Sequence, residues 1–270
     1  HRLIRRQRQM CIRDSQYPVI LGPMRRKTLG EMAATVSNSG GFGQIAASGL
    51  SAEQLRREIA KARNLTDRPI GVNIPIYRPN ASEALEISIE AGIQIITTSA
   101  GNPAKLIKRI KEAGLKVLHK VSSEDMALKA EAYGVDGIIA TGYEAGGHLG
   151  RNGTTTICLI PQLVDVVKIP IVAAGGIADA RGLVAAFALG AEGVEMGTRF
   201  LATHECPVPY CYKQLVLDAK SDSTVVLAEK TMPIRVLKNR MLEITRQHDK
   251  AQENKHLHRL DSGSTYKQSE

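Results

Sequence analysis

The chain is poor in residues that mark several common classes of protein. Of its 270 residues none is Trp and three are Phe, so it offers few rings on which the bases of a nucleic acid could stack. Its cysteines, Cys11, Cys158, Cys206 and Cys211, form no Cys-x-x-Cys pair. Because a chain of this size needs no disulfide staples, we expect reduced thiols and a cytoplasmic location.

Long hydrophobic runs are also absent. No apolar stretch approaches the roughly 20 residues needed to cross a bilayer, so we expect no membrane partner. The basic segment 1–15 lacks the apolar region and small-residue cleavage site of a signal peptide. We interpret it as a disordered or non-native leader.

The net charge of +9 is concentrated at the two ends of the chain. Residues 1–27 contain eight Lys or Arg against one acid, Asp14, and residues 230–270 are also basic, whereas the middle is close to neutral. A nucleic-acid enzyme would place basic residues across its folded face. We therefore expect no nucleic-acid partner.

A metal site is not expected either. His204, Cys206 and Cys211 lie close in sequence, but their spacing matches no zinc pattern and supplies too few ligands. Ordinary packing is the simpler interpretation of these side chains.

Short β-branched runs alternate with amphipathic stretches from residue 17 onward, a pattern typical of repeated βα units and a parallel sheet. Eight such units favour closure into a (β/α)8 TIM barrel, because an open doubly wound sheet would more often stop at roughly five to seven strands. That open sheet is the alternative. The predicted strands are 18–21, 43–47, 70–74, 93–97, 116–120, 137–140, 170–174 and 193–196.

Helices are predicted between these strands, over 51–62, 103–113, 123–133 and 181–189, and two more, over 215–220 and 234–247, extend the barrel at its C-terminal side. Ser51 is placed to cap the first, and Gly114, Gly134 and Gly190 follow three others where a left-handed C-cap would lie. We expect one domain over 16–249, followed by a polar tail over 250–270.

The chemistry of such a barrel lies on the loops that follow the strands. After strands seven and eight come the segments 173–179 and 195–199, which contain Gly175, Gly176 and Gly197. Glycines let backbone N–H groups approach an anion without interference from Cβ, and a helix N-terminus adds its positive dipole end. The two loops together predict a phosphate cradle.

The loop after strand six, 141–150, contains four glycines and His148. Such a loop can lie flat against a planar ring while the imidazole projects into the site. A single His is more often structural, but its position in a glycine-rich loop on the catalytic face favours a catalytic acid or base. By contrast, we interpret His119, His256 and His258 as structural or solvated.

Three earlier loops carry weaker signals. Pro23, in Gly22-Pro23-Met24, stiffens a turn against which a ring could pack, and Asn73 offers donor and acceptor groups to a heterocycle edge. The segment 98–103 is equally well explained by Asn102 capping a helix that begins at Pro103.

Several motifs now occur in order: Gly22-Pro23-Met24, 36–43, Gly71-Val72-Asn73, Glu144-Ala145-Gly146-Gly147-His148, 173–179 and 196–200. With them the chain resembles the nitronate monooxygenases, formerly called 2-nitropropane dioxygenases, over roughly residues 17–240. That family is closely related to the flavin-dependent enoyl-acyl-carrier-protein reductases.

The resemblance implies a barrel that holds one FMN non-covalently. The phosphate would lie on Gly176 and on the segment from Glu195 to Thr198, and the isoalloxazine would contact Met24, Asn73, Thr141 and Gly146. The family's catalytic His corresponds to His148. The other cofactor contacts that we predict are Gly22, Pro23, Gly147, Gly175, Met196 and Gly197.

Four positions depart from the family's usual pattern. Position 141, often Gln or Glu, is Thr, and position 195, often Gln, is Glu. Ala180 replaces a Gly, which adds a Cβ to a turn that tolerates positive φ. The segment 208–213 lacks a His that relatives carry near the barrel mouth.

The predicted activity is the FMN-dependent oxidation of alkyl nitronates or nitroalkanes by O2. The sequence is compatible with a homodimer but does not determine the oligomeric state. Reduction of a 2-enoyl thioester with NAD(P)H would need the same barrel, flavin and His, so it is the alternative. A flavin- or phosphosugar-binding barrel without redox turnover is a third class, and it would leave the His loop without a role.

Overall fold

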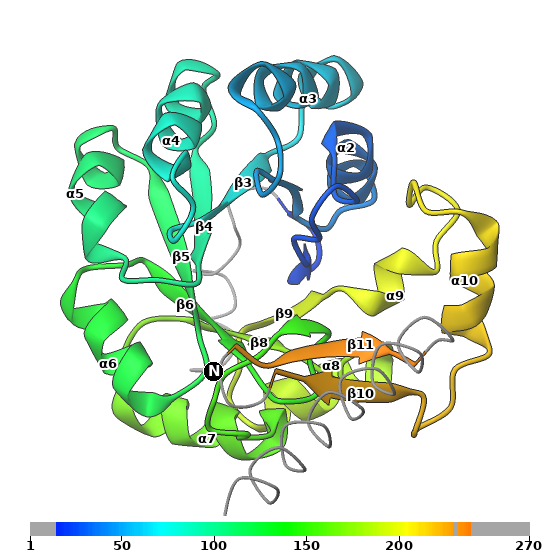
Figure 1. Cartoon of the computed structure of the whole chain (residues 1–270). Helices are drawn as coiled ribbons and strands as arrows, with labels where there is room; N and C mark the ends of the chain where they lie inside the picture. Colours follow the sequence, from blue (N-terminus) through cyan, green and yellow to red (C-terminus); the bar gives the residue numbers. More distant parts are fainter. Residues whose placement is uncertain (1–14, 229–231, 239–270) are drawn as a thin grey trace, which may run out of the picture.

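The computed structural model describes residues 15–228 and 232–238. Eight parallel strands form one sheet in the order β1, β9, β8, β6, β5, β4, β3, β2. A parallel bridge between Ile20 and Phe42 joins the two ends of this order, so the sheet curls into a nearly closed barrel (Figure 1). The predicted (β/α)8 TIM barrel is confirmed, and the open sheet is wrong.

All eight predicted strands are present, with boundaries shifted by at most a few residues. The largest change is in the fourth, which was predicted over 93–97 and begins and ends two residues later. The barrel strands are β1 (Val19–Leu21), β2 (Gly43–Ala46), β3 (Ile70–Pro75), β4 (Ile95–Ser99), β5 (Lys116–Val121), β6 (Gly137–Thr141), β8 (Ile171–Ala174) and β9 (Gly193–Met196).

Helices follow the strands and surround the barrel in chain order (Figure 1). Ser51 caps α3 as predicted, because its hydroxyl accepts from the Gln54 N–H at 3.2 Å while the Gln54 side chain accepts from the Ser51 N–H. The surrounding helices are α2 (Gly30–Asn38), α3 (Ala52–Leu65), α4 (Ala81–Glu90), α5 (Ala104–Glu112), α6 (Glu124–Ala132), α7 (Thr156–Val166) and α8 (Ala180–Ala188).

The three predicted C-cap glycines adopt positive φ: 72° at Gly114, 83° at Gly134 and 100° at Gly190. The concern about Ala180 is removed, since this residue is the first of α8, where a Cβ is normal. Asp179 caps the same helix by accepting from the Arg181 N–H at 2.9 Å.

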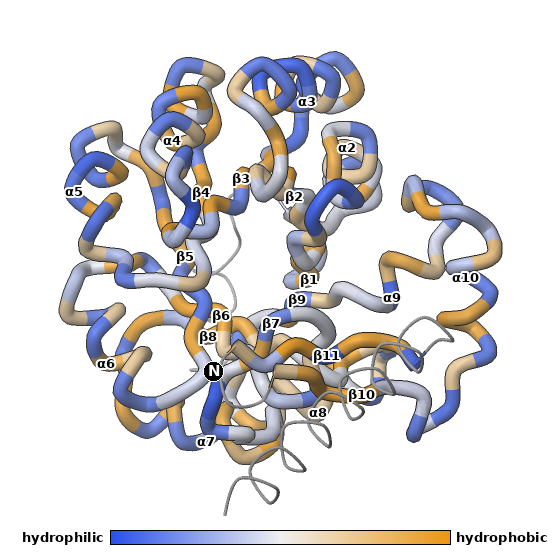
Figure 2. The backbone as a smooth tube through the Cα atoms, viewed as in Figure 1, coloured by the Kyte–Doolittle hydropathy of each residue, from blue (hydrophilic) through white to orange (hydrophobic). Residues whose placement is uncertain are grey.

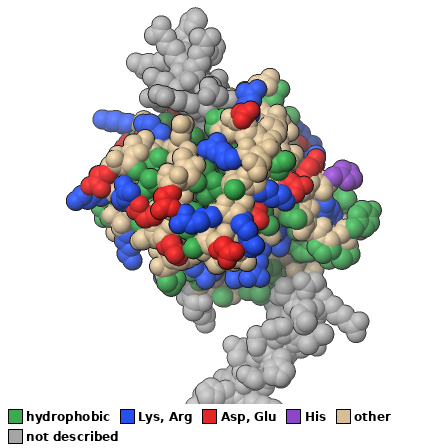
Figure 3. Space-filling view, turned by 90° about the horizontal axis from the view of Figure 1, so that it is seen from above, with side chains coloured by type: hydrophobic (Ala, Val, Ile, Leu, Met, Phe, Trp, Pro, Cys, Tyr) green, Lys and Arg blue, Asp and Glu red, His purple; other side chains and the backbone are tan. Residues whose placement is uncertain are grey.

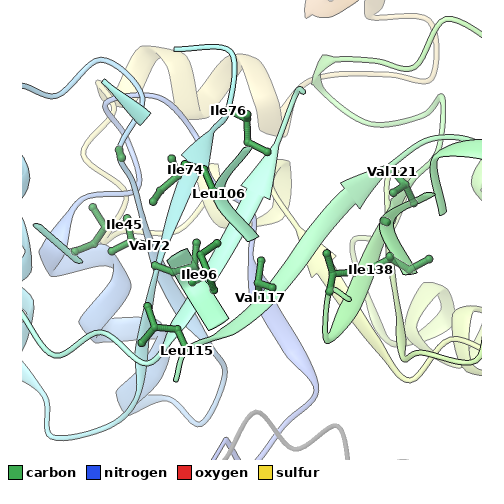
Figure 4. Packing of buried hydrophobic residues seen from close by; sticks show 14 of the residues in the cluster. Ile45, Val72, Ile74, Ile76, Ile96, Leu106, Leu115, Val117, Val121 and Ile138 are labelled. Atoms are coloured by element: carbon green, nitrogen blue, oxygen red, sulfur yellow. The ribbon is translucent and has the colours of Figure 1, made fainter. Parts of the chain in front are cut away.

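The main hydrophobic core lies between the outer face of the sheet and the helices. Its side chains come from consecutive strands and from the helices that cover them, as Figure 4 shows for Val72, Ile96, Val117 and Leu106. This layer accounts for why the parallel strands consist almost entirely of apolar residues on their outer face.

A second, smaller core fills the inside of the barrel near the N-terminal ends of the strands. Because Gly71 has no side chain, the ring of Phe42 occupies the space beside it, and a Cβ at Gly71 would lie 2.6 Å from the Phe42 Cζ. We call the lower part of this cluster the lower interior layer; it consists of Ile20, Phe42, Ile95, Leu118, Ile139 and Val172.

The chain beyond β9 differs from the prediction. After the short α9 (Thr198–Leu201), α10 covers Tyr210–Leu217, so the helix predicted over 215–220 begins and ends earlier. The segment Ile234–Leu237 is a strand, β11, and not the start of a helix, because it pairs with β10 (Thr224–Leu227). Residue 238 is not helical either. Residues 239–247 of that predicted helix, residues 1–14 of the predicted leader and the predicted tail 250–270 lie outside the described residues.

The outer helical surface is well solvated. Figure 3, which views the molecule from the side of α3 and α4, shows basic and acidic side chains interspersed, and several of them pair across helices, such as Lys61 with Glu31 and Arg109 with Glu86. Such exposed pairs add little stability. Within the described residues no helix is long and apolar enough to span a membrane.

Candidate active site

The barrel interior becomes polar toward the C-terminal ends of the strands. Side chains two residues apart on a strand face the same side, so each residue two positions after a member of the lower interior layer also points inward. Gln44 follows Phe42 in this way, and Lys120 follows Leu118. On β3 and β9 the outward residues are Val72 and Val194, so Asn73 and Glu195 beside them point inward too. We call the resulting set the upper interior layer: Gly22, Gln44, Asn73, Thr97, Lys120, Thr141, Ala174 and Glu195.

Hydrogen bonds connect five members of the upper interior layer across the barrel. The Lys120 ammonium contacts a carboxylate oxygen of Glu195, whose other oxygen accepts from the Gln44 amide at 3.4 Å. The Thr97 hydroxyl donates to the Gln44 carbonyl oxygen and accepts from the Asn73 amide at 2.9 Å. Asn73 and Glu195 are thus oriented inside the barrel, as a binding role for both requires.

Thr141 is the member of this layer that is not satisfied. Its Oγ1 is buried and has no hydrogen-bond partner within the described part of the protein. Buried polar atoms are normally paired, so this oxygen is suited to a ligand group entering from the barrel mouth.

The predicted phosphate loops and the His148 loop meet at one side of the mouth. Gly175 has a φ of +102°, and a Cβ there would lie 3.1 Å from the Ala145 nitrogen. A Cβ on Gly146 would lie 3.6 Å from the Thr198 hydroxyl oxygen. The loops after β6, β8 and β9 are therefore contiguous, and glycine keeps the space between them open.

The turn after β1 joins the same group of loops. The Gly22 N–H donates to the Met196 carbonyl oxygen at 2.7 Å, and a Cβ on Gly197 would lie 3.9 Å from the Met24 sulfur. Pro23 lies between Gly22 and Met24 and fixes the direction of this turn. The structure thus brings the predicted contacts of loops one and eight together.

Glu144 anchors the His148 loop. Its carboxylate accepts from the Thr156 N–H at 2.8 Å and from the Thr156 hydroxyl at 3.0 Å, at the first residue of α7. A carboxylate is stabilised there by the unpaired N–H groups of the helix start. The acidic residue of the motif is therefore explained by loop structure.

His148 is exposed and belongs to a small sheet at the barrel mouth. The two-residue strand β7 (Gly147–His148) pairs with β11, with His148 opposite Ile234, and Figure 2 shows the two strands side by side. The Leu149 N–H also donates to the Pro233 carbonyl oxygen at 2.9 Å. We call the antiparallel pair of β10 and β11 the C-terminal hairpin. It holds the backbone before and after His148 in place.

Arg235 strengthens this attachment. Its guanidinium donates twice to the Tyr143 carbonyl oxygen, at 2.9 and 3.2 Å, and lies 5.2 Å from the centroid of the Tyr143 ring. It also donates to the Thr224 hydroxyl on β10 at 3.1 Å. One side chain thus connects the hairpin with the loop that carries His148.

The remaining candidates are structural. His119 is buried, shares a 2.8 Å hydrogen bond with Thr98, and burial lowers its pKa to about 4. The Asn102 side chain accepts from the Ala104 N–H at 2.9 Å, which supports the capping interpretation of segment 98–103. Cys206 packs in an apolar cluster with Leu21 and Met32, as predicted.

Sequence reasoning missed Gln44, Thr97, Lys120 and Arg235. The first three could have been found by following the inward alternation of each strand to its last residue, because a charged Lys120 two positions after Leu118 must enter the barrel. No local signal identifies Arg235, since its role depends on pairing with a distant loop.

The chain was compared with known proteins. Residues 6–262 match the family model described as nitronate monooxygenase. A probable nitronate monooxygenase of Staphylococcus saprophyticus subsp. saprophyticus is 35% identical, over 87% of this chain and 79% of the relative.

The chain is also similar to solved structures, two of which are FabK and a nitroalkane oxidase. FabK from Thermotoga maritima has a TM-score of 0.81 and is 42% identical, covering 83% of this chain and 72% of its own. Nitroalkane oxidase from Streptomyces ansochromogenes has a TM-score of 0.77 and is 28% identical, covering 84% and 78%.

Proposed function

Because the chain belongs to the nitronate monooxygenase family of oxidoreductases, we propose that it binds FMN and oxidises alkyl nitronates with O2, using His148 as acid or base. The observation that carries this proposal is the Thr141 oxygen in the polar upper interior layer, which has no partner among residues 15–228 and 232–238 and lies next to glycine-lined loops. A planar heterocycle with a phosphate tail has the chemistry that such a site would satisfy.

The residues present fit FMN. Gly175, Gly176, Gly197 and Thr198 would hold the phosphate, because positive φ values of 102° and 71° at the first two expose backbone N–H groups. Met24, Asn73, Thr141 and Gly146 would hold the isoalloxazine. When bound, FMN would accept two electrons from the substrate and pass them to O2.

His148 would handle the proton of a neutral substrate. A neutral nitroalkane carries a proton on the carbon next to its nitro group, and a nitrogen of the exposed imidazole can take it up. A nitronate has already lost that proton, so it needs His148 only for orientation. The attachment of β7 to β11 keeps the imidazole at the mouth of the barrel.

The rest of the barrel would exclude water. The lower interior layer is apolar and fully packed, with Ile139 and Val172 at 0% exposure, so a substrate can approach only from the mouth. The protein groups that meet it there belong to the loops and to the hairpin.

A second candidate function is the reduction of a 2-enoyl thioester with NAD(P)H. One observation favours it: the chain is 42% identical to FabK, an enoyl-acyl-carrier-protein reductase, and only 28% identical to the nitroalkane oxidase. Both activities require the same flavin site, so the choice depends on substrate.

Substrate assays separate the two candidates. The FMN-loaded protein should consume O2 with propionate 3-nitronate, and it should oxidise NAD(P)H slowly when a crotonyl thioester is the acceptor. Brisk enoyl reduction without nitronate-dependent O2 uptake would replace the first function with the second.

Substitution of His148 tests the assigned base. The His148→Ala protein should oxidise nitroethane about 10² to 10⁴ times more slowly, the usual contribution of a positioned acid or base, while oxidation of the preformed nitronate largely survives. His204→Ala, at another exposed His, is the matched control and should leave both rates unchanged. Equal rates with nitroethane in the His148→Ala and unsubstituted proteins would rule out the assignment.

A further inference from the structure

Lys120 and Glu195 are the charged members of the upper interior layer, and they face each other across the barrel. The side chain of Lys120 is 20% exposed and that of Glu195 is 5% exposed. Their strands, β5 and β9, are separated in the sheet by β6 and β8, so the contact spans the interior. The cation is therefore already neutralised at the base of the site.

Glu195 is held in this orientation from its other side. The Gln44 amide donates to Glu195 at 3.4 Å and to the Leu21 carbonyl oxygen at 2.7 Å, while its carbonyl oxygen accepts from Thr97. The proposed reaction assigns no role to this buried carboxylate, which is 5% exposed.

We propose that Glu195 tunes the redox potential of the bound flavin by cancelling the charge of Lys120. This inference rests on the proposed FMN site. Asn73 and Thr141, which would contact the isoalloxazine, belong to the same layer as the pair, so the pair acts on the ring from close by. Interactions between charges are weakly screened in such a buried setting.

The direction of the effect follows from electrostatics. Reduction adds electrons to the ring, and a free ammonium beneath it would stabilise the reduced form. Glu195 removes that stabilisation, so the flavin has a lower potential and donates its electrons more readily. A positioning residue of this kind changes how easily the site is reduced without touching the substrate.

The test is the midpoint potential of the FMN-loaded protein, measured by reductive titration. Glu195→Gln should raise the potential, with about a tenfold increase in the ratio of reduced to oxidised flavin at a fixed potential, or about 30 mV for a two-electron couple. Lys120→Met should lower the potential, because Glu195 then lacks its counter-charge. Removal of both charges should return the potential close to that of the unsubstituted protein.

Glu83→Gln is the matched control, since it removes an exposed carboxylate from the outer surface of α4 and should leave the potential unchanged. The dissociation constant of oxidised FMN is measured by adding FMN to the FMN-free protein. In Glu195→Gln it should change by less than the factor of about ten expected for the ratio of reduced to oxidised flavin.

Two results would overturn the inference in distinguishable ways. If FMN binds normally but neither Glu195→Gln nor Lys120→Met moves the potential, the electrostatic role of the pair is wrong and the proposed function stands. If the unsubstituted protein binds no FMN, the proposed function fails and the inference fails with it.

Discussion

The two interior layers of the barrel differ although they come from the same strands. Phe42, Ile95 and Leu118 in the lower layer are followed two residues later by Gln44, Thr97 and Lys120 in the upper layer. The lower side chains pack against one another, whereas the polar side chains of the upper layer form hydrogen bonds, except that the Thr141 hydroxyl has no partner among the described residues. Two residues along each strand thus separate an apolar, packed layer from the polar layer that we propose to bind the flavin.

The largest expected effect comes from breaking the lower layer. Phe42 is 1% exposed, and Phe42→Ala should lower the free energy of unfolding by about 3–5 kcal/mol, because it leaves a cavity inside the barrel. Urea denaturation measures this loss. The rate per folded molecule should be retained at low temperature, since the substitution removes no polar group of the site.

Phe187→Ala is the control for that substitution. Phe187 lies on α8 and is only partly buried, so its truncation should cost clearly less. Equal losses at the two positions would show that the lower interior layer has no special weight in stability.

The second-largest expected effect is on the pH dependence of stability, and it compares an inward with an outward polar side chain on β5. Lys120 faces the interior, whereas its neighbour His119 faces the helices, and burial lowers the pKa of His119 to about 4 from 6.5. As the pH falls, His119 takes up its proton at a higher pH in the unfolded chain than in the folded protein, which favours unfolding. Neutral His119 therefore contributes fully to the free energy of unfolding above about pH 6.5, and this contribution is lost toward pH 4. The difference amounts to about 3 kcal/mol.

His119→Asn should flatten the pH dependence of stability between pH 4.5 and 7, as followed by urea denaturation at several pH values. His204→Ala should preserve the slope, because His204 is exposed. A slope unchanged in His119→Asn would show that other groups cause the acid sensitivity.

The smallest expected effect concerns Thr141 in the upper layer. Thr141→Val keeps the shape but removes the hydroxyl, which has no partner within the described residues. The FMN-free protein should therefore keep its stability, while the affinity for FMN falls by about 2- to 12-fold, the value of one hydrogen bond. Fluorescence titration measures the affinity.

Thr97→Val provides the opposite case. Its hydroxyl is paired with Gln44 and Asn73, so the substitution should destabilise the FMN-free protein. If Thr141→Val were the destabilised variant and kept its FMN affinity, the distinction between satisfied and unsatisfied members of the layer would be lost.

The sequence allowed the barrel to be predicted because eight short β-branched runs alternate with amphipathic stretches, and because strand-end loops converge in a barrel. The glycines and His148 could be found for that reason. The upper interior layer was found only in part, since a single polar residue at the end of an apolar strand also fits a solvated loop.

The C-terminal hairpin was not predicted. Ile234–Leu237 is four residues long and has no turn signal that distinguishes a strand from a helix end. Its conformation is decided by pairing with β10 and with β7. β7 is distant in sequence and only two residues long, so the sequence around 234–237 gives no sign of it. Tertiary contacts therefore determined the local structure there.

The most direct test of the account is the absorption spectrum of the purified protein after incubation with FMN and removal of the excess, together with the mass of the chromophore released by heating. The account predicts a flavin spectrum and one FMN per chain. A colourless protein that retains no flavin would contradict the central claim that the upper interior layer and its loops form a flavin site.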